Sequence, residues 1–176
     1  YSLQLIGDGV TAQVIRYNDI SNPQITVARV YLYFPSGGLP NSDWNLFVFH
    51  IATANTTGGI QVSSSGQTAG DIGAGSSVNG PTLSVDEWHI FDMRLDITGT
   101  TWTLDWQIVG AAQTQAVFAG QATTDSVDYL RVGSSTSTII GTVYFDYLVY
   151  SETGVDYPIG AGKTEFIKPT ADGTHN

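Results

Sequence analysis

Short runs of β-branched and aromatic residues recur along the whole chain, and glycine, asparagine, serine and proline separate them. No window combines the apolar spacing of an amphipathic helix with residues that cap a helix. Runs of this kind between turn residues are typical of β-strands. Many short strands without helices predict an all-β fold, either an antiparallel β-sandwich or a barrel. The expected strands are 2–6, 11–17, 24–34, 44–52, 59–63, 88–97, 101–109, 114–118, 126–132 and 142–150.

The stretch 88–109 shows the clearest alternation, because each of its two strands has an apolar face and a more polar face. A Thr-Gly-Thr link between the strands predicts a short hairpin turn. The apolar faces comprise His89, Phe91, Met93, Leu95, Ile97, Trp102, Leu104, Trp106 and Ile108. The other faces comprise Trp88, Ile90, Asp92, Arg94, Asp96, Thr101, Thr103, Asp105 and Gln107.

Two other regions differ from this pattern. The strands expected at 24–34 and 44–52 are apolar on both faces, which indicates strands that are covered on both sides. The stretch 63–81 is rich in serine and glycine. It predicts a polar connection, or one weak strand flanked by loops.

Acidic residues outnumber basic residues, 16 against 6, and the net charge of the 176-residue chain is −10. A surface that binds nucleic-acid phosphates or anionic lipids needs clustered lysine and arginine. We therefore expect neither a nucleic acid nor a membrane as a partner. The chain has no cysteine, so it has no disulfide framework and no thiol chemistry.

Several segments, taken in order, resemble a concanavalin A-like (laminin-G-like) domain. The sequence Gly-Thr-Val-Tyr-Phe-Asp-Tyr-Leu-Val-Tyr at 141–150 is similar to the closing strand of such domains, and Trp-Thr-Leu-Asp-Trp at 102–106 is similar to a hairpin return. The resemblance implies one antiparallel jelly-roll β-sandwich over residues 1–158. The other segments that carry it are 1–9, 27–34, 58–62, 84–96 and 129–135.

The end of the chain resembles tails that follow this domain in structural proteins of tailed bacteriophages. The strings are Val-Asp-Tyr-Pro-Ile-Gly at 155–160 and Ala-Asp-Gly-Thr-His-Asn at 171–176. The resemblance implies a virion protein on the outer surface of a capsid or tail, oligomeric and in contact with other virion proteins. Its role would be decoration or weak adhesion to host-surface glycans, and 159–176 would lead to a further part of the chain. The alternatives are an extracellular bacterial carbohydrate-binding module attached to a larger enzyme, and a degenerate glycosidase.

The acidic residues do not form a glycosidase pattern. Retaining glycosidases place two carboxylates about 5–5.5 Å apart. Asp92 and Asp96 share a strand face but lie roughly 13 Å apart on a regular strand, so we expect a salt-linked, solvated face there and no enzymatic activity. Three glutamates are present, none of them in the Glu-x-Asp-x-x-Glu strand of family-16 glucanases: Glu87, Glu152 and Glu165.

Sugar binding on this fold would use an aromatic platform with asparagine or aspartate beside it. Trp44 follows a Pro-Asn-Ser-Asp turn and is the best candidate for an exposed tryptophan, although a core position is favoured even for this residue. Asp146, the acid within the closing strand, is either a sugar contact or an outward-facing strand acid. The candidate carbohydrate-binding residues are Trp44, Asn45, Tyr31, Tyr33 and Asp146.

Calcium is the one cofactor that the acidic loops suggest, because it takes oxygen ligands from loops. The candidate ligands are Asp8, Asp71, Asp125 and Asp128. No histidine pair has the spacing of a zinc site, and we expect His50 and His89 to be core residues with satisfied hydrogen bonds.

Overall fold

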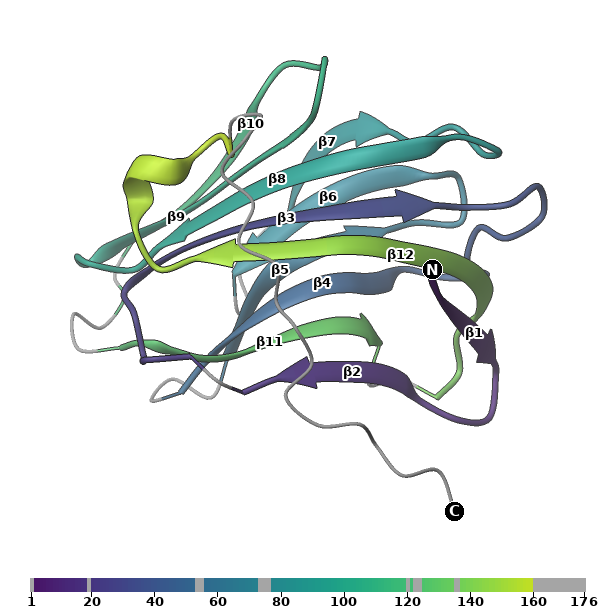
Figure 1. Cartoon of the computed structure of the whole chain (residues 1–176), viewed down its shortest axis with the longest axis horizontal. Helices are drawn as coiled ribbons and strands as arrows, with labels where there is room; N and C mark the ends of the chain where they lie inside the picture. Colours follow the sequence, from purple (N-terminus) through teal and green to yellow (C-terminus); the bar gives the residue numbers. More distant parts are fainter. Residues whose placement is uncertain are drawn as a thin grey trace.

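The computed structural model describes residues 2–18, 20–52, 56–72, 77–119, 121, 125–134 and 137–159. These residues form two six-stranded antiparallel sheets that pack face to face as a sandwich, with one short 3₁₀ turn, η1, at Gly154–Asp156 (Figure 1). The predicted all-β antiparallel β-sandwich is therefore confirmed.

Each sheet combines one run of consecutive strands with strands from distant parts of the chain. Sheet A has the order β1 (Leu3–Asp8), β12 (Ile140–Ser151), β3 (Ile25–Tyr33), β8 (Trp88–Asp96), β9 (Thr101–Ile108) and β10 (Thr114–Ala119). Sheet B has the order β2 (Gln13–Tyr17), β11 (Val127–Ser134), β4 (Trp44–Ile51), β5 (Thr56–Val62), β6 (Gln67–Ile72) and β7 (Val78–Thr82).

The core lies between the inner faces of the two sheets. The apolar side chains of β8 and β9 point into it, and Trp102 and Trp106 are at most 1% exposed, so the predicted alternation of the 88–109 hairpin is confirmed. Each large apolar side chain buried in this way stabilises the fold by about 1.5–3 kcal/mol. His89 is also buried, and its Nε2 lies 2.9 Å from the backbone oxygen of Ser84, as expected for a satisfied core histidine.

The polar stretch 63–81 contains two strands, β6 and β7, where the sequence predicted one weak strand at most. Their glycines explain the difference. A Cβ on Gly70 would lie 2.5 Å from the ring of Trp106, and one on Gly80 would lie 2.5 Å from its Nε1. Strand propensity disfavours glycine because it has no side chain to pack, but here the missing side chains make room for the indole of β9.

The segment 154–159, which follows β12, lies on the outer surface of sheet A. After β12, the chain turns at η1 and crosses the sheet near the start of β3 (Figure 1). Ile159 is 3% exposed and packs against Val27 and Val149, which point outward from β3 and β12. This contact accounts for Val27, the apolar residue at the covered end of the outer face of β3. The proposed domain end at residue 158 stays a prediction, and residues 160–176 lie outside the described residues.

Candidate functional site

Aromatic side chains form a row across the outer face of sheet A. The strand register places Tyr33 of β3 opposite Trp88 of β8 on one side and Tyr144 of β12 on the other. The ring centroids of Tyr33 and Trp88 are 5.5 Å apart, and those of Tyr33 and Tyr144 are 5.8 Å apart. Gln4 of β1 extends the row by donating a hydrogen bond of 2.9 Å to the Tyr144 hydroxyl.

A β-bulge adds a second pair of rings beside this row. The pairing of β12 with β3 shifts between Asp146 and Val149, and Tyr147 within the bulge has a φ of 55°, which is unusual for a residue other than glycine. The Tyr147 ring lies 5.6 Å from that of Tyr31. Asp146 fixes the bulge, because its Oδ1 accepts a hydrogen bond of 2.8 Å from the Tyr147 backbone N–H.

These five rings are here called the aromatic face: Tyr31, Tyr33, Trp88, Tyr144 and Tyr147. Trp88 is 45% exposed and Tyr147 is 40% exposed, and the other three are half-buried. Side chains of this size are normally hidden in a soluble protein, and a group of them at the surface, rimmed by polar residues, is typical of a binding site.

Acidic side chains rim the aromatic face. Asp86, with a φ of 64°, accepts a hydrogen bond of 2.7 Å from the Ser36 backbone N–H, and its Oδ1 lies 3.4 Å from the Tyr33 hydroxyl. Burial and the neighbouring Asp86 carboxylate raise the pKa of Tyr33, so its hydroxyl stays protonated. Asp146 is exposed at the same rim, on the strand position opposite Tyr31.

Beyond the aromatic face, the outer surface of sheet A carries buried ion pairs. Asp92 of β8 is fully buried and pairs with Arg29 of β3 through two hydrogen bonds of 2.6 and 2.7 Å. This carboxylate raises the pKa of Arg29. Gln107 donates a longer bond of 3.4 Å to Asp92, and Arg29 also donates to the backbone oxygen of Ile159.

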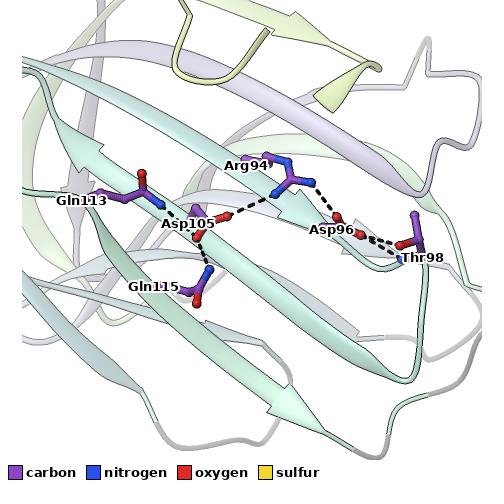
Figure 2. A network of polar contacts seen from close by, with 6 residues as sticks. All are labelled: Arg94, Asp96, Thr98, Asp105, Gln113 and Gln115. Atoms are coloured by element: carbon purple, nitrogen blue, oxygen red, sulfur yellow. Dashed lines mark hydrogen bonds and ion pairs between the residues drawn. The ribbon is translucent and has the colours of Figure 1, made fainter. Parts of the chain in front are cut away.

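A second network continues along the same surface (Figure 2). Asp105 of β9 accepts hydrogen bonds of 3.1 Å from Gln113 and 2.6 Å from Gln115. Arg94 lies between two carboxylates, 2.6 Å from Asp96 and 3.4 Å from Asp105. The expectation of a salt-linked face at Asp92 and Asp96 is confirmed, but the expectation that it is solvated is wrong for Asp92, which is 0% exposed. Asp105 of the neighbouring strand is also buried, at 3% exposed.

The segment 154–159 accounts for part of this burial. A Cβ on Gly154 would lie 3.3 Å from Nε of Arg94, so the turn passes directly over that guanidinium. Burial, and then the Asp105 and Asp92 carboxylates, raise the pKa of Tyr157 well above its usual range. Among the described residues, this segment therefore covers the half of the outer face with the ion pairs, and the aromatic face is the open half.

The sequence-predicted sugar-binding residues separate into two groups. Tyr31, Tyr33 and Asp146 come together at the aromatic face. Trp44 is 1% exposed within the core, which confirms the favoured core position and removes it as a candidate sugar contact. Asn45 lies half-buried on β4 of sheet B, away from the aromatic face.

Sequence reasoning missed three members of the aromatic face: Trp88, Tyr144 and Tyr147. A signal was present for Trp88, because it is a tryptophan on the polar face of an amphipathic strand. Tyr144 and Tyr147 are three apart and would fall on opposite faces of a regular strand. Only the bulge, which the sequence did not predict, brings both to the outer face.

The aspartates proposed as calcium ligands do not converge. Asp8 accepts backbone hydrogen bonds of 2.8 and 2.7 Å from Val10 and Thr11, and these lower its pKa. Asp125, before β11, is 1% exposed, and neither of its carboxylate oxygens has a hydrogen-bond partner among the described residues. Asp128 lies 2.6 Å from Nδ1 of His50, which is half-buried on sheet B instead of in the core.

Asp71, on β6, is the fourth of these aspartates, and burial raises its pKa. No group of three histidine, aspartate or glutamate side chains suited to a metal ion occurs among the described residues. Within the same residues, no helix is long and apolar enough to span a membrane.

Solved structures with the same fold are named for proteins that act on polysaccharides or sialic acids, or that cellulose induces. A cellulose-induced protein is 10% identical with a TM-score of 0.64, over 86% of this chain and 79% of that chain. An alginate lyase from Aplysia kurodai is 9% identical with a TM-score of 0.58, over 85% and 82%. A Trypanosoma rangeli sialidase is 12% identical with a TM-score of 0.63, over 86% of this chain but 25% of that chain.

The fold is a jelly-roll β-sandwich of the concanavalin A-like kind. No protein-family model matches the sequence, and no curated protein matches it either. The expectation that the chain is not an enzyme is contradicted by these structures, because alginate lyases and sialidases are enzymes and share its fold. The missing glutamate pattern excluded only one glycosidase arrangement, which was too narrow a ground for excluding catalysis on this fold.

Proposed function

We propose that this protein binds glycans on the aromatic face of sheet A. The observation that carries the proposal is the row of Trp88, Tyr33 and Tyr144 on the outer face of three neighbouring strands, in which Trp88 is 45% exposed and the two tyrosines are half-buried. The C–H groups of a pyranose ring pack on aromatic rings, and a row of rings offers contacts to successive sugars of a chain.

Polar groups beside the rings suit sugar hydroxyls. Hydroxyls both donate and accept hydrogen bonds, and the rim offers carboxylate acceptors at Asp146 and Asp86, an amide at Gln4 and tyrosine hydroxyls. The names of the structural neighbours, alginate lyase and sialidase among them, support a role with carbohydrates. For an exposed row of rings we expect weak binding, with a Kd on the order of 0.1–1 mM for an oligosaccharide.

The test is a glycan array followed by isothermal titration calorimetry with the glycans that bind. Trp88→Ala should weaken binding at least about tenfold, which corresponds to about 1.4 kcal/mol. Tyr129→Ala is the matched control, because Tyr129 is a half-buried aromatic residue on the outer face of sheet B. An array without binding, or equal losses in the two variants, would refute the proposal. The proposal would also be refuted if the aromatic face bound only other proteins.

The location of the protein stays a separate proposal that rests on the sequence resemblance alone. A place on the outer surface of a phage capsid or tail, as an oligomer among other virion proteins, would make glycan binding a means of host adhesion. The alternative is an extracellular bacterial carbohydrate-binding module within a larger enzyme. Mass spectrometry of purified particles distinguishes them, because the first requires this chain in stoichiometric amounts.

Calcium also stays a proposal. If an ion binds at one of the loop aspartates, a chelator should lower the melting temperature and added calcium should restore it. An unchanged melting curve would remove calcium from the account.

A further inference from the structure

We infer that the aromatic face selects neutral glycans and rejects polyuronates and sialylated chains. This inference rests on the proposed function and adds the chemical class of the ligand. It separates this chain from the alginate lyases and sialidases with the same fold, whose names refer to anionic sugars.

All four arginines of the chain are described, and none of them presents a guanidinium to the aromatic face. Arg29 is engaged by Asp92, and Arg94 is engaged by Asp96 and Asp105, both in the half of sheet A that the segment 154–159 covers. Arg16 and Arg131 lie opposite each other on β2 and β11 of sheet B. Within the described residues, which contain no lysine, an anionic sugar therefore has no cation to pair with at this face.

The charges that do border the aromatic face are negative. Asp146 is exposed beside Tyr147, and the Asp86 carboxylate lies 3.4 Å from the Tyr33 hydroxyl. A carboxylate accepts hydrogen bonds from sugar hydroxyls, whereas it repels the carboxylate of a uronate or sialic acid. The face therefore discriminates against anionic sugars in two ways: its carboxylates repel them, and no cation attracts them.

The protein contains its own reporter for this site. Trp44, Trp102 and Trp106 are at most 1% exposed, whereas Trp88 is 45% exposed, and these are the four tryptophans of the chain. A ligand on the aromatic face should therefore change the tryptophan emission through Trp88, and a ligand elsewhere should leave it unchanged.

The experiment is a fluorescence titration of the full chain with hexasaccharides of matched length. The neutral probes are cellohexaose, mannohexaose and N-acetylchitohexaose, and the anionic probes are mannuronate and galacturonate hexamers and an oligosialic acid. We expect at least one neutral hexamer to bind about tenfold or more tightly than every anionic one. Its affinity should be the same at low and high salt, because no ion pair contributes.

Three further measurements separate the outcomes. Asp146→Asn should reduce the ratio of neutral to anionic affinity. In Lys163→Gln/Lys168→Gln, which removes both lysines, the ratio should not change. Anionic hexamers that bind as tightly as neutral ones, with emission changes lost in Trp88→Phe, would overturn the inference and leave the proposed glycan site intact. No response to any hexamer, together with an empty array, would refute the proposed function itself.

Discussion

Replacing Arg29 with methionine should be among the most destabilising single changes on the surface of sheet A. Asp92 is 0% exposed, and its carboxylate accepts two hydrogen bonds of 2.6 and 2.7 Å from the Arg29 guanidinium. Without Arg29, its remaining side-chain donor is Gln107 at 3.4 Å. Removing one partner of a buried ion pair costs about 3–5 kcal/mol, because a buried charge is left uncompensated.

The free energy of unfolding of Arg29→Met is measured by urea denaturation, followed by far-ultraviolet circular dichroism. For a chain of this size, the same loss corresponds to a decrease in Tm of about 6–20 °C. The double variant Arg29→Met/Asp92→Leu should be more stable than Arg29→Met alone, since it removes the stranded carboxylate. Arg16→Met is the control. It removes an exposed guanidinium 4.5 Å above the Tyr129 ring and should cost about 1 kcal/mol or less.

A loss of less than about 1 kcal/mol in Arg29→Met would refute this reasoning. It would mean that the Asp92 carboxylate reaches water, and that the segment 154–159 does not cover this half of the sheet in solution. A double variant less stable than Arg29→Met would contradict the account of the uncompensated charge.

Three other changes test the packing and the electrostatics. Gly70→Ala should destabilise the fold by about 1–3 kcal/mol in urea denaturation, because its Cβ would lie 2.5 Å from the Trp106 ring. A cost near zero would contradict that packing. Tyr157→Phe should be neutral or stabilising by up to about 1–3 kcal/mol, because it removes a buried hydroxyl for which the described part of the chain provides no hydrogen-bond partner. A clear loss of stability in Tyr157→Phe would contradict this and indicate that the hydroxyl has a hydrogen-bond partner. Burial raises the pKa of Asp71, so its charge opposes folding above its unfolded-state pKa. Asp71→Asn should therefore be more stable than the wild type at pH 7, and the difference should vanish as the pH falls below about 4. A stability difference between Asp71→Asn and the wild type that grows as the pH falls would contradict a raised pKa of Asp71.

The sequence predicted the sandwich and the faces of the central hairpin because those features depend on local alternation. Trp102 and Trp106 fall in the core because every second residue of β9 faces it, and Trp88 is exposed by the same rule. Strands β6 and β7 were not predicted because they contain glycines, which local strand propensity disfavours. Gly70 and Gly80 make room for the Trp106 ring of β9, which is 26 or more residues away along the chain.

The candidate site was only partly predictable for a related reason. Tyr31 and Tyr33 could be proposed from their own strand, but the aromatic face depends on which strands neighbour β3. The register that sets Tyr33 between Trp88 and Tyr144 joins residues more than 50 positions apart in the chain. Trp44 was proposed because a turn precedes it, and a turn at the start of a strand does not decide which face the first side chain takes.

The central claim is that glycans bind on the aromatic face, and fluorine NMR of protein labelled with 5-fluorotryptophan tests it most directly. The chain has four tryptophans, so the spectrum should contain four resonances, and the Trp88→Phe variant assigns one of them. On titration with the glycan that binds best on the array, the account predicts that the Trp88 resonance moves and saturates. The resonances of Trp44, Trp102 and Trp106, which are buried in the core, should stay in place. A glycan that binds by calorimetry and leaves the Trp88 resonance unmoved would contradict the account.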